Sequence, residues 1–294
     1  MKILLTGKDG QVGLALHKKL LSLGDVIATG RHELDLGNPD AIKTFIDKTK
    51  PDIIINPAAY TAVNKAESEI SLAHQINTIA PQIFTEKASE LNIPIIYFST
   101  NYVFDGLKNK PYIETDQTNP QSVYGQTKWK GEEAVRSHKK HFILRTGWVF
   151  SPHEKNFLTA ILKSIQEKNI LYIVKDQKGT PISAETLADV TINVVEKIFN
   201  VSQFTNFGTY HVSSGGETNR YEYACFVTDE AIKLGLQSKM TSSNIKAISA
   251  LDYEDEARRP INSILGTEKI KNTFMLQLPN WEDEVRNFLK KAIK

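Results

Sequence analysis

The chain has 294 residues, of which 40% are hydrophobic and 24% are charged. This composition is typical of a folded globular protein and excludes the disordered and fibrous classes. Thirty-six basic and 34 acidic residues leave a net charge of +2, without the concentrated basic character of a binder of nucleic acid or membrane surfaces. A single cysteine, Cys225, excludes an intramolecular disulfide, and no apolar run reaches the ~18 residues of a membrane span. We therefore expect a cytoplasmic protein that binds neither nucleic acid nor membrane.

Short apolar runs and amphipathic segments alternate through the first half of the chain. The runs that we interpret as buried strands cover residues 2–6, 26–29, 53–56, 93–99 and 142–145. After the first run, Val12, Leu16, Leu20 and Leu23 recur at three- and four-residue spacing, which predicts a helix over 11–23. Alternating strands and helices are typical of a parallel sheet, so we predict an α/β fold with a doubly wound sheet of the Rossmann kind.

Three glycines, Gly7, Gly10 and Gly13, lie where the first predicted strand turns into the first helix. Glycine permits a sharp turn and a close approach to a pyrophosphate, whose charge the free N–H groups of the helix N-terminus stabilise. The GxxGxxG spacing differs by one residue from the GxGxxG fingerprint, and the alternative is a plain strand-to-helix turn. Its place at the start of an alternating β/α pattern favours a dinucleotide site.

The tip of the second predicted strand is basic, at Arg31. NAD-selective sites usually carry an acid here for the ribose 2′-hydroxyl, whereas an arginine suits the 2′-phosphate of NADPH. The alternative is an ordinary solvated arginine, with Glu33 and Asp35 close by in the sequence. We predict NADPH as the cofactor, with NADH as its alternative.

Tyr124 and Lys128 form a YxxxK pattern in a segment that can continue as a helix, where residues four apart share a face. A neighbouring cation lowers the pKa of a phenol and makes it a usable proton donor. A surface pair without function has the same pattern. Thr100 ends another predicted strand, where ligands of such sheets bind, and its hydroxyl suits a carbonyl oxygen or the cap of the following turn.

Beyond about Val149 the pattern becomes irregular, and prolines and a run of serines and glycines at 213–216 interrupt it. We interpret residues 1–150 as the NAD(P)-binding Rossmann domain. Residues 151–294 are interpreted as mainly a smaller, mixed C-terminal substrate-binding lobe, with some segments returning to the first domain.

Motifs in order along nearly the whole chain resemble those of the extended short-chain dehydrogenase/reductases. They include GKDGQVG at 7–13, NPAAYTAVNKAE at 56–67, STNYVFDG at 99–106, YGQTKWKGE at 124–132, RTGWVF at 145–150, DQKGTP at 176–181 and RRPINS at 258–263. Their order and spacing together are specific. The branch that the chain resembles reduces the C4 ketone of dTDP-4-dehydro-L-rhamnose with NAD(P)H in nucleotide-sugar and cell-surface polysaccharide biosynthesis.

The resemblance implies a catalytic set of Thr100, Tyr124 and Lys128, with Tyr124 as the proton donor and Lys128 also holding the nicotinamide ribose. The implied cofactor contacts are Gly7, Gly10, Gln11, Val12, Gly13, Arg31, Asp35, Leu36, Ala58, Ala59, Tyr60, Phe98, Tyr124 and Lys128. Thr100, Asn101 and Trp148 are the implied contacts of the dTDP-sugar substrate, and the alternative for Trp148 is a core aromatic.

Four departures from the family pattern bear on the sugar: Asn101 replaces an aspartate, Gly147 stands where serine is common, Ile182 where threonine is expected and Gly266 where aspartate is expected. Some members bind a metal between subunits through three glutamates. Glu185 and Glu282 match two of these positions, but the third is Ala15, so we predict no metal. A homodimer remains open.

The alternatives for function are the reduction of another 4-keto-6-deoxy nucleotide sugar and a non-catalytic, NADP-binding regulatory subunit. Fold similarity alone does not separate them. The presence of Thr100, Tyr124 and Lys128 favours the enzyme, whereas Asn101 and Gly147 keep the regulatory alternative open.

Overall fold

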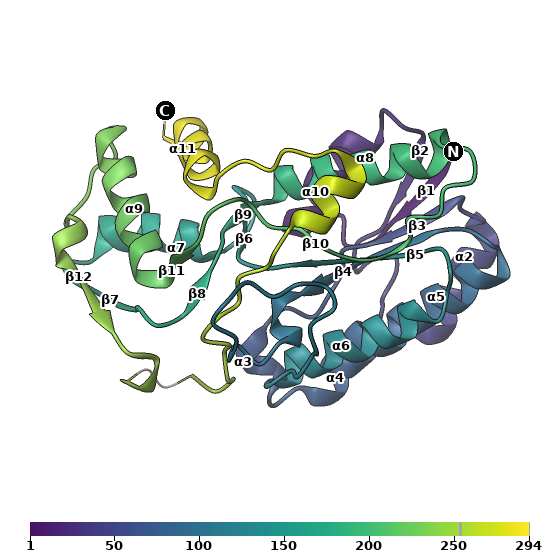
Figure 1. Cartoon of the computed structure of the whole chain (residues 1–294), viewed down its shortest axis with the longest axis horizontal. Coiled ribbons are helices and arrows are strands. Elements are labelled where there is room, and N and C mark those ends of the chain that lie inside the picture. Colours follow the sequence, from purple (N-terminus) through teal and green to yellow (C-terminus); the bar gives the residue numbers. More distant parts are fainter. Residues whose placement is uncertain (253–254, 294) are drawn as a thin grey trace.

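The computed structural model describes residues 1–252 and 255–293. A sheet with helices on both faces forms the right-hand part of the molecule in Figure 1, and a smaller group of helices and short strands forms the left-hand part. Within the described residues, no helix has the length and apolar character needed to cross a membrane.

The central sheet of the described residues has six parallel strands in the order β2-β1-β3-β4-β5-β10. Their bounds are β1 Lys2–Leu5, β2 Asp25–Ala28, β3 Ile53–Asn56, β4 Ile95–Thr100, β5 His141–Thr146 and β10 Gly208–His211. The first five overlap the predicted strands, and the doubly wound α/β prediction is confirmed. The strand order reverses between β1 and β3, and ligands of such sheets bind outside the carboxyl ends of the strands at this switch point.

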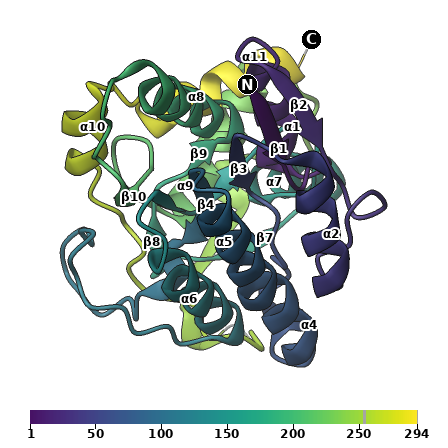
Figure 2. The same cartoon turned by 90° about the vertical axis from the view of Figure 1, so that its right-hand side faces the viewer.

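Helices cover both faces of the sheet, α8 and α10 above it and α5 and α6 below it in Figure 2. On the first face lie α1 Gln11–Leu20, α8 Ala184–Asn200 and α10 Glu268–Phe274; on the second lie α2 Pro39–Thr49, α5 Ala80–Glu90 and α6 Val123–Arg136. Each face buries its own apolar cluster, represented by Leu16 with Leu187 and by Ile42 with Phe84. Apolar burial of this kind is the main stabilising contribution to the fold.

Local sequence sets the helix boundaries near the sheet. The Asn38 side chain accepts from the N–H of Ala41 at 3.1 Å, and Pro39 occupies the first helical position of α2, as expected of a capped N-terminus. The connection from β3 to α5 contains α3 Val63–Ala66, α4 Ile70–His74 and the π-helical turn η1 Gln75–Ile79. Short 3₁₀ turns lie at η2 Asn101–Val103, η3 Ser242–Asn244 and η4 Ala250–Asp252.

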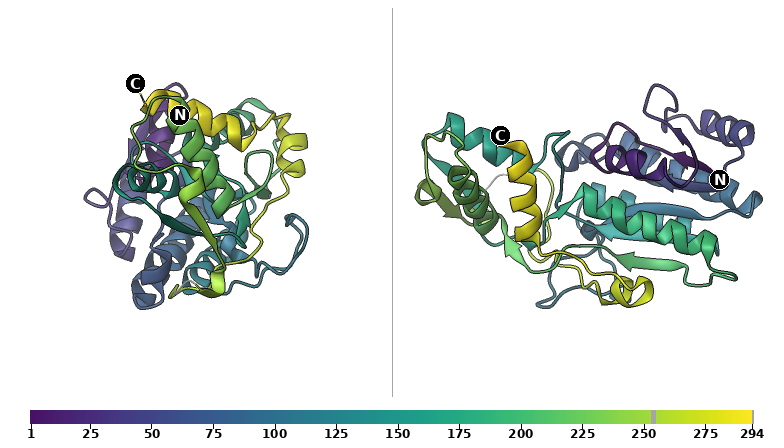
Figure 3. Two further views of the ribbon diagram at one scale, coloured as in Figure 1. Left: turned by 90° about the vertical axis from the view of Figure 1, so that its left-hand side faces the viewer. Right: turned by 90° about the horizontal axis from the view of Figure 1, so that it is seen from above.

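The smaller group packs beside the sheet domain, as the right-hand view of Figure 3 shows. Its helices are α7 Phe157–Glu167, α9 Arg220–Lys233 and α11 Trp281–Ala292. Its short strands pair as β6 Val149–Phe150 with β9 Ile182–Ser183, β7 Leu171–Val174 with β12 Ile245–Ile248, and β8 Lys178–Gly179 with β11 Thr218–Asn219. These elements enclose a separate apolar cluster that includes Leu158, Val227 and Leu289. Although α8 and β10 follow residue 150, they pack with the sheet; the division at residue 150 stays an interpretation.

Candidate active site

The glycine turn after β1 excludes a side chain at two of its three glycines, Gly7 and Gly13. Gly7 has a φ of +60°, and a Cβ on Gly13 would lie 1.8 Å from the Gly7 carbonyl oxygen. The turn leads into α1 at Gln11, whose preceding residue Gly10 offers no side-chain cap and whose first turn contains no acid. The amides at this helix N-terminus therefore remain available to an anion.

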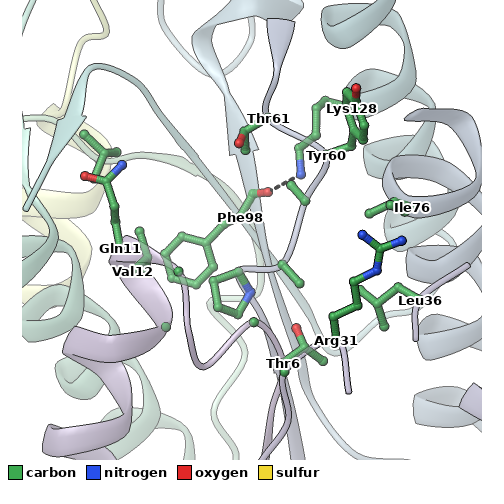
Figure 4. Close-up of a pocket in the computed structure, with 18 of the residues that line it drawn as sticks. Thr6, Gln11, Val12, Arg31, Leu36, Tyr60, Thr61, Ile76, Phe98 and Lys128 are labelled. Carbon is green, nitrogen blue, oxygen red and sulfur yellow. Dashed lines mark hydrogen bonds between the residues drawn. The ribbon is translucent and has the colours of Figure 1, made fainter. Parts of the chain in front are cut away.

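A cavity of 510 Å³ opens beside this turn, and Figure 4 shows that side chains from several elements converge on it. Every cofactor contact implied by the resemblance lines it: Gly7, Gly10, Gln11, Val12, Gly13, Arg31, Asp35, Leu36, Ala58, Ala59, Tyr60, Phe98, Tyr124 and Lys128. These residues span more than 120 positions of the sequence, and the parallel sheet brings them together because its strands all end at one edge.

At the β2 end of the cavity, the two acids near Arg31 are engaged elsewhere. Glu33 pairs with Lys8 and accepts from the N–H of Gly30 at 2.8 Å, and its hydrogen bond with Lys8 lowers the pKa of Glu33 to about 2. Asp35 accepts from the N–H of Gly37 at 2.9 Å. Arg31 is exposed at the cavity wall and forms no salt bridge within residues 1–252 and 255–293. Its guanidinium is free to meet an anionic group.

Lys128 is buried on α6, with 2% of its surface exposed. Its Nζ donates to the Phe98 carbonyl oxygen at 2.6 Å, the dashed bond in Figure 4, and lies 4.0 Å from the centre of the Tyr97 ring. Burial lowers the pKa of Lys128 to about 7, although the charge of Glu132 opposes this change. Lys128 can therefore gain or lose a proton near neutral pH.

Tyr124 lies in the first turn of α6, which begins where the Ser122 side chain accepts from the N–H of Gly125 at 3.2 Å. Its ring packs edge-on against Tyr102, with the two centroids 5.6 Å apart. Burial raises the pKa of Tyr124 to about 12, and a hydrogen bond with Thr100 counteracts this only in part. The sequence-based expectation of a lowered pKa is thus wrong for this protein without cofactor, because burial outweighs any effect of Lys128. At neutral pH Tyr124 is a protonated phenol, the form that a proton donor requires.

Thr100 ends β4, and its Oγ1 accepts from the N–H of Tyr102 at 3.2 Å, so it also caps the following 3₁₀ turn. Asn101 is buried and donates from Nδ2 to the Ser263 carbonyl oxygen at 3.1 Å. A Cβ on Gly147 would lie only 2.2 Å from Asn101 Nδ2. Asn101 therefore occupies the space that a side chain at position 147 would need, and it is not among the residues that line the cavities.

A second cavity, of 620 Å³, lies between the sheet and the smaller lobe, and Trp148 is half-buried in its wall. The Trp148 backbone has a left-handed φ of 52°, and a Cβ on Gly179 would meet the indole at 2.4 Å. A bulky residue in this backbone region is strained, and such strain is typical of functional sites. Trp148 also packs against the apolar cluster of the smaller lobe and stacks on Tyr223, so it lies at the boundary between that core and the cavity.

Two arginines that the sequence did not single out line the same cavity. The Arg220 guanidinium lies 3.9 Å from the centre of the Trp148 ring and 4.7 Å from that of Phe157. Arg259 donates to Tyr102 Oη and to Asn64 Oδ1, each at 3.1 Å. Arg220 begins α9 and gave no signal in the sequence, whereas Arg259 lay within a motif whose role was not assigned. Arg259 is also paired with Asp255, which lines the same cavity, whereas Arg220 forms no salt bridge among the described residues; Arg220 is thus the cation best suited to an anionic group such as a diphosphate.

The glutamates considered for a metal lie in different surroundings. Glu185 lines a third cavity, of 410 Å³, together with Ala15, and its Oε2 lies 3.4 Å from Lys19 Nζ. Glu282 does not line that cavity; its carboxylate lies near Gly216. Among the described residues, no three histidine, cysteine or acidic side chains are grouped to hold a metal ion.

The parallel sheet, the glycine turn and the Tyr124–Lys128 pair define a Rossmann-fold protein of the short-chain dehydrogenase/reductase class. Residues 1–293 match the family described as RmlD substrate binding domain, and the chain belongs to this family, as the motif resemblance predicted. The dTDP-4-dehydrorhamnose reductase of Shigella flexneri is 40% identical over 98% of this chain and 97% of its own length.

Solved structures agree with this assignment. A dTDP-4-dehydrorhamnose reductase from Clostridium acetobutylicum is 31% identical, with a TM-score of 0.90 and 99% of each chain covered. A second, from Bacillus anthracis and in complex with NADP, is 29% identical, with a TM-score of 0.89 and the same coverage. The likeness therefore extends through both the sheet and the smaller lobe.

Proposed function

We propose that this protein reduces the C4 ketone of dTDP-4-dehydro-L-rhamnose to dTDP-L-rhamnose with NADPH. The observation that carries the proposal is the contact between two cavities: Gln11, Thr61 and Val149 line both the cofactor cavity and the cavity of the two arginines. A nucleotide sugar held in the second cavity can thus present its ketone to the first. The names of the relatives and the NADP of the Bacillus anthracis structure support the same reaction.

The residues of the cofactor cavity fit NADPH. The glycine turn and the N-terminus of α1 suit the pyrophosphate, and Arg31 suits the 2′-phosphate because it forms no salt bridge with either nearby acid. Lys128 lies beside Tyr124 on α6, where it can meet the nicotinamide ribose. When bound, the cofactor supplies the hydride.

The protein's own groups handle the proton. Thr100, whose hydroxyl is hydrogen-bonded to Tyr124, would hold the ketone oxygen beside the phenol, although Thr100 itself is buried beneath the cavity lining. As the hydride adds to C4, the O–H bond of Tyr124 breaks and its proton passes to the developing alkoxide, which leaves a phenolate. Lys128 can return a proton to this phenolate, since its pKa of about 7 allows it to reload from solvent at neutral pH.

In the second cavity, Arg220 and Arg259 hold the substrate diphosphate, and the indole of Trp148 lies against the sugar. The wall of this cavity holds the ketone in the orientation that hydride transfer requires, so part of the binding energy lowers the reaction barrier. The homodimer and the cytoplasmic location stay predictions.

The test is direct. Purified protein is mixed with NADPH and enzymatically made dTDP-4-dehydro-L-rhamnose, absorbance at 340 nm is followed, and the C4 configuration of the product is determined by NMR. Loss of absorbance with formation of dTDP-L-rhamnose supports the proposal. The C4 epimer would assign the protein to another 6-deoxy sugar, and unchanged absorbance with tight NADPH binding would assign it a regulatory role.

A further inference from the structure

Helix α6 carries a second buried ionisable side chain besides Lys128. Glu132 lies one helical turn after Lys128, and none of its surface is exposed. In the sequence it is one of two adjacent glutamates, and the other, Glu133, faces solvent. A fully buried carboxylate is costly unless it is paired and hydrogen-bonded, so its partners define what it does.

Glu132 has partners from both neighbouring strands. Arg145 of β5, itself only 1% exposed, donates from Nε at 2.8 Å and from Nη2 at 2.7 Å in a bidentate pair. Ser99 of β4 donates from Oγ at 2.5 Å. Arg136, one turn further along α6, donates from Nη2 at 2.7 Å. The carboxylate therefore connects one helix with two strands through charged and short hydrogen bonds.

The residues that bind Glu132 are neighbours of the residues that we assign to the reaction. Ser99 lies between Phe98, whose carbonyl holds Lys128, and Thr100. Ser99 is also the strand partner of Arg145, as Thr100 is of Thr146. If α6 shifted along β4, the distance from Tyr124 to Thr100 would change, and the hydrogen bond from Lys128 to the Phe98 carbonyl would break at the same time.

We propose that Glu132 is a positioning residue for this reductase: its carboxylate fixes α6 against the ends of β4 and β5, so that Tyr124 and Lys128 keep their places relative to Thr100. The inference rests on the proposed function for the meaning of these residues. A buried ion pair contributes little net stability compared with apolar residues of similar volume, so the stability of the fold alone does not account for this pair.

Glu132 also acts on Lys128 through its negative charge, in addition to fixing the position of α6. The groups around Lys128 are Glu132 and Tyr124 on its own helix and Tyr97 on β4, and Glu132 supplies the negative charge among them. On β5, Arg145 is paired with Glu132, and burial, aided by Arg145, lowers the pKa of the adjacent His211 to about 3, so His211 is neutral. Without Glu132, Lys128 would lose its proton at a lower pH.

Glu132→Gln and its matched control, Glu133→Gln, test the proposal. Both glutamates bind Arg136, but only Glu132 reaches Ser99 and Arg145. We expect Glu132→Gln to lower kcat about 10- to 100-fold and to shift the alkaline limb of its pH profile down by roughly one pH unit. Glu133→Gln should retain the parent kcat and pH profile. A parent-like kcat in folded Glu132→Gln protein would overturn the positioning role, and an unshifted limb would overturn the effect of its charge on Lys128.

Ser99→Ala provides a second test if the Glu132→Gln variant does not fold. It removes the bond to β4 and keeps the charge, so we expect kcat to fall roughly threefold to tenfold while the alkaline limb stays in place. A parent-like kcat would contradict the positioning role. NMR of ¹³C-labelled lysine reports the pKa of Lys128 without turnover, so a lowered value in Glu132→Gln supports the proposal even where the parent fails to reduce the proposed ketone.

Discussion

The cofactor cavity and the arginine cavity are built in different ways. The first lies at the carboxyl ends of regular parallel strands, and its residues come mainly from local motifs. The second is formed by paired segments as far apart as Trp148, Arg220 and Arg259, joined by two-residue strands and isolated bridges. The first type of site depends on backbone geometry, whereas the second depends on how side chains pack.

This difference indicates how readily substitutions can change the function of each cavity. A glycine turn tolerates few changes, because a Cβ on Gly13 meets the backbone of Gly7. Side-chain stacking such as that of Arg220 on Trp148 and Phe157 can be altered one residue at a time. We therefore expect cofactor chemistry to be fixed by the sheet and substrate choice by the smaller lobe, a rule that the following variants test from the largest effect to the smallest.

Tyr124→Phe should lower kcat by about 10²- to 10⁴-fold, because it removes the proton donor and leaves the ring in place. NADPH affinity, measured by cofactor fluorescence, should stay close to that of the parent protein. A parent-like kcat would show that another group donates the proton.

Arg220→Ala should raise KM for the dTDP-sugar about 10- to 100-fold, because a charged hydrogen bond to the diphosphate is lost. The dissociation constant of NADPH should not change, since Arg220 lines only the second cavity. Arg286→Ala is the matched control: Arg286 also stacks on an aromatic ring, that of Phe226 at 5.0 Å, but lines neither cavity. Equal effects of the two variants would remove the diphosphate assignment.

Arg31→Ala should weaken NADPH binding by about tenfold and leave NADH binding nearly unchanged, since only NADPH carries the 2′-phosphate. Arg31 is exposed, so added salt should reduce the preference of the parent for NADPH toward that of the variant. Titration with both cofactors at low and high salt measures this. If the affinities for NADPH and NADH fall by the same factor, Arg31 does not contact the 2′-phosphate.

Lys128→Met should stabilise the protein while lowering turnover. In the parent, the Lys128 pKa is about 7 in the folded state against an ordinary 10.5, so below pH 7 folding carries the full cost of a buried charge. Between these values the unfolded state binds more protons, so the stability of the parent rises with pH. The advantage of the variant, about 1 to 3 kcal/mol at pH 6, should therefore shrink toward pH 10.5 in urea titrations. An advantage independent of pH would mean that Lys128 has the same pKa in the folded and unfolded states, so that burial does not lower it.

The sequence predicted the strands of the sheet well because their signals are local. Strand runs, the glycine spacing and the helical period each lie within about 20 residues, and the predicted strand 53–56 coincides with β3. It missed Arg220 and the role of Glu132, because a charged residue on a helix has the same pattern whether it faces solvent or a partner distant in sequence. It also gave the wrong direction for the Tyr124 pKa, which burial decides.

Because a side chain at position 147 would meet Asn101, the residues that one position tolerates depend on the residue at the other. A serine at 147 requires that the buried amide first leave, yet that amide is also bonded to the carbonyl of Ser263. An aspartate at 101 lacks the N–H that this bond uses. Asparagine and aspartate are similar in size, so a side chain at position 147 is expected to be tolerated only where residue 101 also moves away from Ser263.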